Sequence, residues 1–111
     1  MANPWIICPQ PNPAARLKLF CLHHAGGSAW MYRPWLTRPV PELEIAALQL
    51  PGHDARRAEP LCTDLPELVG RLADALEPGL DRPWGLFGHS MGALLGHELA
   101  HELGRRGSLP A

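Results

Sequence analysis

Residues 84–96 read Trp-Gly-Leu-Phe-Gly-His-Ser-Met-Gly-Ala-Leu-Leu-Gly, and this stretch decides the fold. Trp84–Gly88 has the pattern of a short strand, and a helical pattern begins directly after Ser90. Gly88-His89-Ser90-Met91-Gly92 fits G-x-S-x-G, a sharp strand-to-helix turn that exposes a serine hydroxyl. The backbone of such a turn is strained, and a glycine on either side avoids clashes. We therefore predict a strand, a tight turn at Ser90 and a helix over Met91–Arg106.

The residues before this turn alternate between strand and helix patterns. Strands are predicted at Leu17–Leu22 and Leu43–Leu50, a short helix over Ala29–Leu36, and a longer helix from the Asp64 cap to Pro78-Gly79. Strands separated by helices imply a mostly parallel sheet with flanking helices, which is an α/β fold. We expect residues 1–16 to be a lead-in and residues 17–111 to form one domain.

Composition excludes several classes of function. With 111 residues, 46% of them hydrophobic, and a net charge of −1, the chain has room for one domain and no strong field for nucleic acid or anionic membranes. Three cysteines without a C-x-x-C pattern favour neither disulfides nor a cysteine zinc site, and fit a reducing compartment. No apolar run is long enough for a signal peptide or a membrane span. We expect a cytoplasmic protein.

A second catalytic pattern overlaps the predicted helix after Ser90. His97-Glu98-Leu99-Ala100-His101 fits H-E-x-x-H, the helical zinc pattern of metalloproteases. The longer form of that motif has a third histidine where this chain has Gly107. At about 100° per residue, both histidines lie nearly opposite the apolar stripe of Leu95, Leu99 and Leu103. We predict a solvated helix face that binds no metal, with a zinc hydrolase using His97, Glu98 and His101 as the minor alternative.

Acyl transfer at a serine needs groups besides the hydroxyl. Ser90 would lie at a helix N-terminus, whose dipole favours the negative charge that develops in the reaction. A second oxyanion donor must come from the loop after an earlier strand. His24-Ala25-Gly26-Gly27 follows the predicted strand Leu17–Leu22, and its glycines allow the necessary turn. Ser90 is therefore the candidate nucleophile.

The polar segment Asp54–Glu59 has two interpretations. By default it is a solvated polar loop. The alternative is a structural network of ion pairs at the rim of the site.

Several blocks of the chain, taken together, resemble the α/β-hydrolase fold and, more narrowly, the type II thioesterases of polyketide and non-ribosomal peptide synthesis. The blocks are LFCLHHAGGSA, YRPW at 32–35, LQLPGHDARRAEP at 48–60, TDLPELV at 63–69, and RPWGLFGHSMGALLGHELA, which ends at Ala100. The resemblance implies that Ser90 attacks an acyl thioester on the phosphopantetheine arm of an acyl or peptidyl carrier protein, without a cofactor. It also implies that the backbone N–H groups of Ala25 and Met91 form the oxyanion hole.

The chain departs from that family in two ways. Proline is usual in place of His23, and an arginine and an acid in place of His53-Asp54. The larger departure is length, since the resemblance puts the triad acid and histidine, in the order Ser, Asp, His, after the helix that follows Ser90. We expect the N-terminal half of an α/β-hydrolase fold, truncated after that helix and catalytically incomplete. His24 and His53, on loops at the same sheet edge, are candidates for a substitute base.

Two functions follow from these expectations. The first is a serine thioesterase by descent, and the second is a truncated carrier-protein-binding module or relic that hydrolyses nothing. An α/β sheet of this size would also leave one edge strand unpaired. We therefore predict a marginally stable chain that self-associates through that edge.

Overall fold

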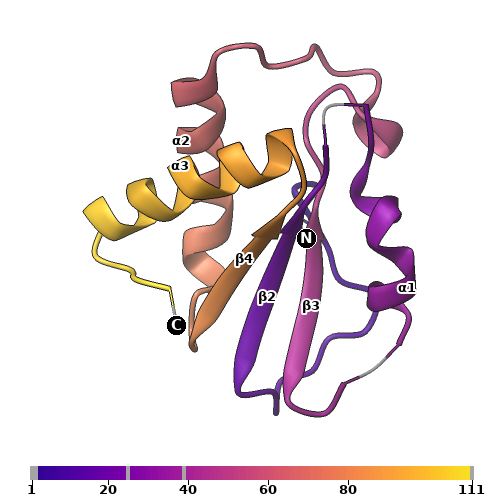
Figure 1. The fold of residues 1–111 in the computed structure, drawn as a ribbon, viewed down its shortest axis with the longest axis vertical. Coiled ribbons are helices and arrows are strands. Elements are labelled where there is room, and N and C mark those ends of the chain that lie inside the picture. Colours follow the sequence, from indigo (N-terminus) through magenta and orange to yellow (C-terminus); the bar gives the residue numbers. More distant parts are fainter. Residues whose placement is uncertain (1–2, 25, 39, 111) are drawn as a thin grey trace.

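The computed structural model describes residues 3–24, 26–38 and 40–110, and its strands form one mixed sheet (Figure 1). The strands are β1 (Ile6–Ile7), β2 (Leu17–Leu22), β3 (Leu43–Leu48) and β4 (Trp84–Gly88), in the spatial order β1-β3-β2-β4. β2 pairs in parallel with both β3 and β4, and β1 pairs antiparallel with β3. The predicted α/β architecture with a mostly parallel sheet is confirmed.

β1 was not predicted from the sequence. It contains only Ile6 and Ile7, which lie opposite Leu48 and Ala47 of β3. Two residues are too few to show a strand period, so the strand depends on its partner rather than on a local pattern. The Gln49 N–H extends the pairing by donating to the Trp5 carbonyl at 2.9 Å.

Helices cover both faces of the sheet. One face carries the 3₁₀ turn η1 (Ala29–Tyr32) and helix α1 (Arg33–Leu36), which pack on Cys21 and Ala47. The other face carries α2 (Leu65–Leu76) and α3 (Met91–Arg105), and the larger core lies beneath them (Figure 1). Within the described ranges, no helix is both long and apolar enough to cross a bilayer.

The start of α2 follows the signal in its sequence. The side chain of Asp64 accepts a hydrogen bond from the Glu67 N–H at 3.3 Å, and Pro66 occupies the first turn. The helix then buries a stripe at helical spacing, comprising Leu68, Val69, Leu72, Ala73 and Leu76. It ends in the 3₁₀ turn η3 (Glu77–Gly79), close to the predicted stop.

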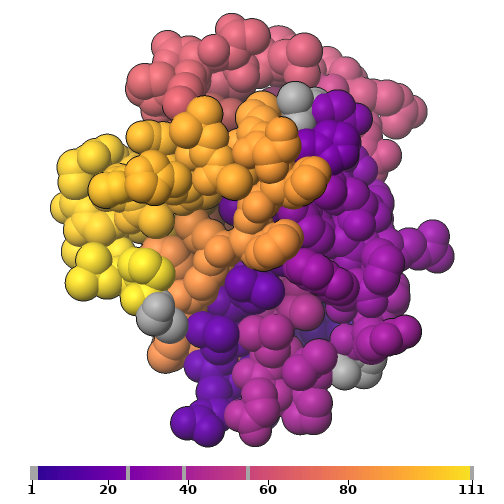
Figure 2. Space-filling view, viewed as in Figure 1, coloured from indigo at the N-terminus to yellow at the C-terminus, as the bar shows by residue number. Residues whose placement is uncertain are grey.

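The outer edge of β4 pairs with no strand among the described residues. A groove of about 430 Å³ runs between this edge and α3, and it is lined mainly by Leu86, Phe87, Ala93 and Gly96. Figure 2 shows the orange and yellow atoms of β4 and α3 at the surface, on the left of the view. The unpaired edge was predicted, and self-association through it stays a prediction.

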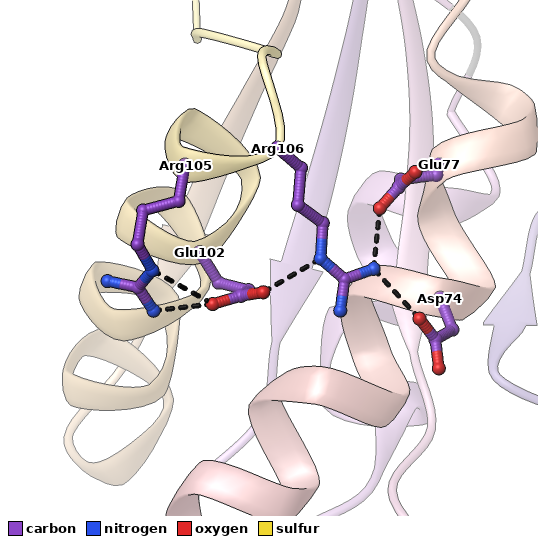
Figure 3. Close-up of polar contacts among 5 residues, drawn as sticks. All are labelled: Asp74, Glu77, Glu102, Arg105 and Arg106. Atoms are coloured by element: carbon purple, nitrogen blue, oxygen red, sulfur yellow. Dashed lines mark hydrogen bonds and ion pairs between the residues drawn. The ribbon is translucent and has the colours of Figure 1, made fainter.

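The C-terminal end of α3 is tied to α2 by Arg106 (Figure 3). Its Nη1 donates to Asp74 at 2.8 Å and to Glu77 at 2.5 Å, and its Nε donates to Glu102 at 2.8 Å. These bonds raise the pKa of Arg106, while Arg106 and Arg105 lower the pKa of Glu102. The guanidinium therefore bridges carboxylates on α3, α2 and η3.

Arg106→Gln should lower the midpoint of urea unfolding, because it removes the bridge between the two helices. Arg105→Gln is the matched control, since Arg105 pairs with Glu102 on its own helix. The difference between the two variants should shrink in 1 M salt, where the Debye length is about 3 Å. Equal midpoints for both variants at low salt would contradict a linking role for Arg106.

Candidate active site

Ser90 occupies a strained turn between β4 and α3. Its φ of 58° and ψ of −119° lie in a region that residues other than glycine rarely adopt. The side chain is exposed, so the turn presents the hydroxyl to solvent beyond the carboxyl end of β4. We call Gly88–Gly92 the elbow, and its geometry is the strand-to-helix turn that the sequence predicts.

Two glycines allow the elbow to pack tightly. A Cβ on Gly88 would overlap the carbonyl group of Gly92, and a Cβ on Gly92 would overlap the carbonyl oxygen of Leu22. These neighbours are backbone atoms, which cannot rotate away as a side chain can. The first turn of α3 therefore rests directly on the carboxyl end of β2.

The elbow places a backbone donor, the N–H of Met91, beside the serine. The N–H groups of Gly92 and Ala93 donate to the carbonyls of His89 and Ser90, each at 2.9 Å. Across residues 3–24, 26–38 and 40–110, no backbone acceptor takes the N–H of Met91. A free N–H at a helix start is suited to binding an anionic oxygen.

The predicted second donor, Ala25, lies outside the described residues. Beside it, the Gly27 N–H donates to the His24 carbonyl at 3.0 Å. A side chain on Gly27 would approach the His24 ring to 3.1 Å, so glycine leaves room for that ring. Ala25 stays a prediction.

The two histidines considered as substitute bases lie at the same sheet edge as the elbow. The His24 ring is 6.0 Å from the ring of His89, centroid to centroid. The Nδ1 of His53 lies 2.9 Å from the Gly27 carbonyl, to which it donates as Nδ1–H. Neither residue hydrogen-bonds the hydroxyl of Ser90 in the described part of the chain, so a base role for them stays a prediction.

His23 is buried in a neutral form. Its Nδ1 donates to the His24 carbonyl at 2.8 Å, and its Nε2 accepts from the Leu50 N–H at 3.4 Å. Burial lowers the pKa of His23, and the nearby rings of His53 and His24 lower it further. If the ring were protonated, Nε2 would carry a hydrogen and could no longer accept from the Leu50 N–H, so this hydrogen bond would be lost.

Within the polar segment Asp54–Glu59, Arg56 is buried and forms an ion pair with Glu59. The default interpretation as a solvated loop is wrong for Arg56, which is only 6% exposed. Its Nε and Nη2 bind both carboxylate oxygens of Glu59 at 2.7 and 2.8 Å, and its guanidinium lies 4.1 Å from the centroid of the Trp5 ring. The bidentate bond to Arg56 lowers the pKa of Glu59.

The H-E-x-x-H pattern lies on an exposed face of α3. The side chains of His97 and His101 are exposed and their ring centroids are 4.6 Å apart, while Leu95, Leu99 and Leu103 opposite them are buried. Among the residues described here, no group of three or more His, Cys, Asp or Glu could hold a metal ion. The predicted orientation of the histidines is confirmed, and the pair lacks a third ligand in this part of the chain.

A tight serine turn over the carboxyl edge of a parallel sheet defines an α/β-hydrolase-type protein. A family model described as "Thioesterase domain" matches residues 17–111. The chain therefore belongs to the thioesterase domain family. The sequence-based recognition of this family is confirmed.

Curated relatives and solved structures agree with this assignment. The chain is 43% identical over 99 residues to the linear gramicidin dehydrogenase LgrE of Brevibacillus parabrevis, covering 89% of this chain and 38% of LgrE. It is 42% identical over 106 residues to a probable cadicidin biosynthesis thioesterase of Streptomyces griseus, covering 96% of this chain and 29% of that protein. The structure of BorB, a type II thioesterase from the borrelidin biosynthetic cluster, matches with a TM-score of 0.88 and 41% identity over 96% of this chain and 44% of BorB. The chain thus spans less than half the length of these relatives.

Gly88→Ala should destabilise the fold by about 2 kcal/mol or more, because the new methyl meets backbone atoms of α3. Gly70→Ala is the matched control, since a Cβ at this position in α2 meets nothing within 4 Å. It should stabilise the protein by about 0.5–1 kcal/mol, as alanine favours a helix interior. Urea unfolding of both variants checks this, and a Gly88→Ala protein as stable as wild type would contradict the close packing of the elbow.

The free energy of unfolding should fall as the pH drops below about 6.5, the ordinary pKa of histidine. Because the pKa of His23 is lowered in the folded state, the unfolded chain takes up its proton first. Stability is then lost by up to about 1.4 kcal/mol per pH unit until the folded pKa is reached. His23→Gln keeps one donor and one acceptor without titrating, so it should flatten this dependence. A slope that is unchanged in His23→Gln would refute the assignment.

Proposed function

We propose that the whole protein is a type II thioesterase-like hydrolase that removes acyl groups from carrier-protein phosphopantetheine in polyketide or non-ribosomal peptide synthesis. Ser90 is its nucleophile, and the N–H of Met91, together with that of Ala25, receives the oxyanion. The observation that carries this proposal is the backbone of Ser90, with a φ of 58° at an elbow that only glycines at 88 and 92 permit.

The geometry supports the first step of acyl transfer. The exposed hydroxyl of Ser90 can approach a thioester carbonyl from solvent, and the neighbouring Met91 N–H is available to the oxygen that becomes negative. The helix dipole of α3 adds to this stabilisation. The relatives' names, which refer to antibiotic biosynthesis and thioesterases, favour acyl chains held on carrier proteins as the substrate class.

Activation of the hydroxyl needs a base, because a serine alcohol is hardly ionised at neutral pH. In the described ranges no histidine nitrogen or carboxylate oxygen hydrogen-bonds to Ser90. The second candidate function is a module that binds carrier proteins without hydrolysing their thioesters. Calorimetry with an acylated carrier protein, followed by an assay for thiol release, separates the two: binding with no release supports the module.

A fluorophosphonate probe should label the whole protein at Ser90, and Ser90→Ala should abolish the labelling. The control is Ser108→Ala, since Ser108 lies after α3 and its hydroxyl accepts from the Trp84 indole. Mass spectrometry of the labelled peptide is the measurement. A folded whole protein that takes no label would count against Ser90 as the nucleophile.

A further inference from the structure

Two loops at the carboxyl edge of the sheet are joined through one buried carboxamide. Residues 23–29 follow β2, and residues 49–53 follow β3. Gln49 is 1% exposed, and its Oε1 accepts a hydrogen bond from the Ala29 N–H at 3.0 Å. Its Nε2 donates to the His53 carbonyl at 3.2 Å. Gln49 thus fixes the end of the first loop, at Ala29, and the end of the second, at His53.

His53 continues this connection to the glycine turn. Its ring Nδ1 donates to the Gly27 carbonyl at 2.9 Å, while its own carbonyl is held by Gln49. The Gly26-Gly27 turn is therefore held at its C-terminal side, at Gly27 by His53 and at Ala29 by Gln49. The neighbouring His24 ring lies 6.0 Å from the ring of His89, so this turn lies beside the elbow.

The backbone of Gln49 is itself fixed. Its N–H donates to the Trp5 carbonyl at 2.9 Å, and its carbonyl accepts from Arg56 Nη1 at 3.0 Å. Trp5 and Arg56 are in turn stacked on each other. With its main chain held from both sides, the carboxamide has little freedom to follow a moving loop.

We propose that Gln49 is a positioning residue that fixes the Gly26-Gly27 turn beside the elbow before a substrate arrives. The inference rests on the proposed function, in which Ala25, the residue directly before this turn, supplies an oxyanion donor. Donors that are already in place stabilise developing charge without reorganisation during the reaction. A carboxamide suits this role because it offers one acceptor to Ala29 and one donor to His53 in a single rigid plane.

Three variants test the role. Gln49→Ala removes both hydrogen bonds, and Gln49→Glu keeps the acceptor but loses the donor when the new carboxyl is ionised. The matched control is Gln10→Ala, because the Gln10 carboxamide is exposed and its Nε2 donates to the Thr37 carbonyl, away from the elbow. For each protein, the rate of fluorophosphonate labelling at Ser90 and the hydrogen exchange of the Ala29 amide are measured under conditions where urea titration shows it to be folded.

Gln49→Ala should slow labelling by about tenfold or more. It should also speed hydrogen exchange of the Ala29 amide by about tenfold, after correction for any change in the exchange of the β2 amides. Gln49→Glu keeps the acceptor for Ala29, so exchange at Ala29 should stay near the wild-type rate. Its labelling should be slow at pH 8, because the donor to His53 is lost, and should recover, relative to wild type at the same pH, as acidification protonates the carboxyl. Gln10→Ala should match wild type in both measurements.

Each result decides the inference. Labelling that stays fast in Gln49→Ala overturns it, whether or not the Ala29 amide loses protection. The inference is also overturned if labelling slows only in proportion to the fraction of unfolded protein and the labelling of Gln49→Glu does not recover at low pH. That result shows a role of Gln49 in stability alone. A whole wild-type protein that takes no label contradicts the proposed nucleophile instead, and the Ala29 exchange in Gln49→Ala then decides whether Gln49 fixes the turn.

Discussion

The contact between the first turn of α3 and the carboxyl ends of β2 and β4 is the constraint on which the site depends. Gly92 lies against the Leu22 carbonyl from the α3 face, and Tyr32 donates its hydroxyl to the same oxygen from the opposite face at 2.7 Å. The helix cannot move closer to β2 or turn without breaking this fit. The unusual φ of Ser90 is the geometry that connects β4 to a helix held in that position.

The loops beside the elbow depend on a different kind of interaction. Their backbone N–H and C=O groups lie outside the hydrogen-bond ladders of the β-sheet, so side chains supply the hydrogen-bond partners. Gln49, His53 and His23 supply these hydrogen bonds from buried or half-buried positions. No side-chain nitrogen or oxygen buried in the described residues lacks a hydrogen-bond partner. The cost of burying polar groups at this edge is thereby offset, which lets the sheet edge be both polar and well ordered.

Local signals made much of the fold predictable. β2 begins and ends at the predicted residues, and the Asp64 cap and the elbow follow patterns that span only three to five residues. β1 was not predictable, because its two residues form a strand only beside β3. The burial of Arg56 was missed for the same reason. Trp5, which covers it, is far away in the sequence, and a charged residue in a polar loop shows no local sign of that cover.

The site was predictable to a similar extent. Gly88, Ser90 and Gly92 carry a motif whose strained turn the structure contains, and the helical period placed His97 and His101 on the exposed face of α3. The role of Gln49 left no trace in the sequence, because a glutamine after a strand is compatible with any exposed turn. Its role depends on hydrogen bonds with Ala29 and His53, and Ala29 comes within hydrogen-bond distance of Gln49 only when β2 and β3 are paired.

The strained elbow also needs α3 to be held at its far end. The 15 residues of α3 form a rod about 22 Å long, and a rotation about its first turn would move Ser90 relative to the glycine turn. Leu95, Leu99 and Leu103 anchor the rod in the core along its length, and Arg106 binds its last turn to α2. The helix is therefore fixed at both ends and along one face. The position of the Ser90 hydroxyl thus depends on packing between α2 and α3 that never touches it.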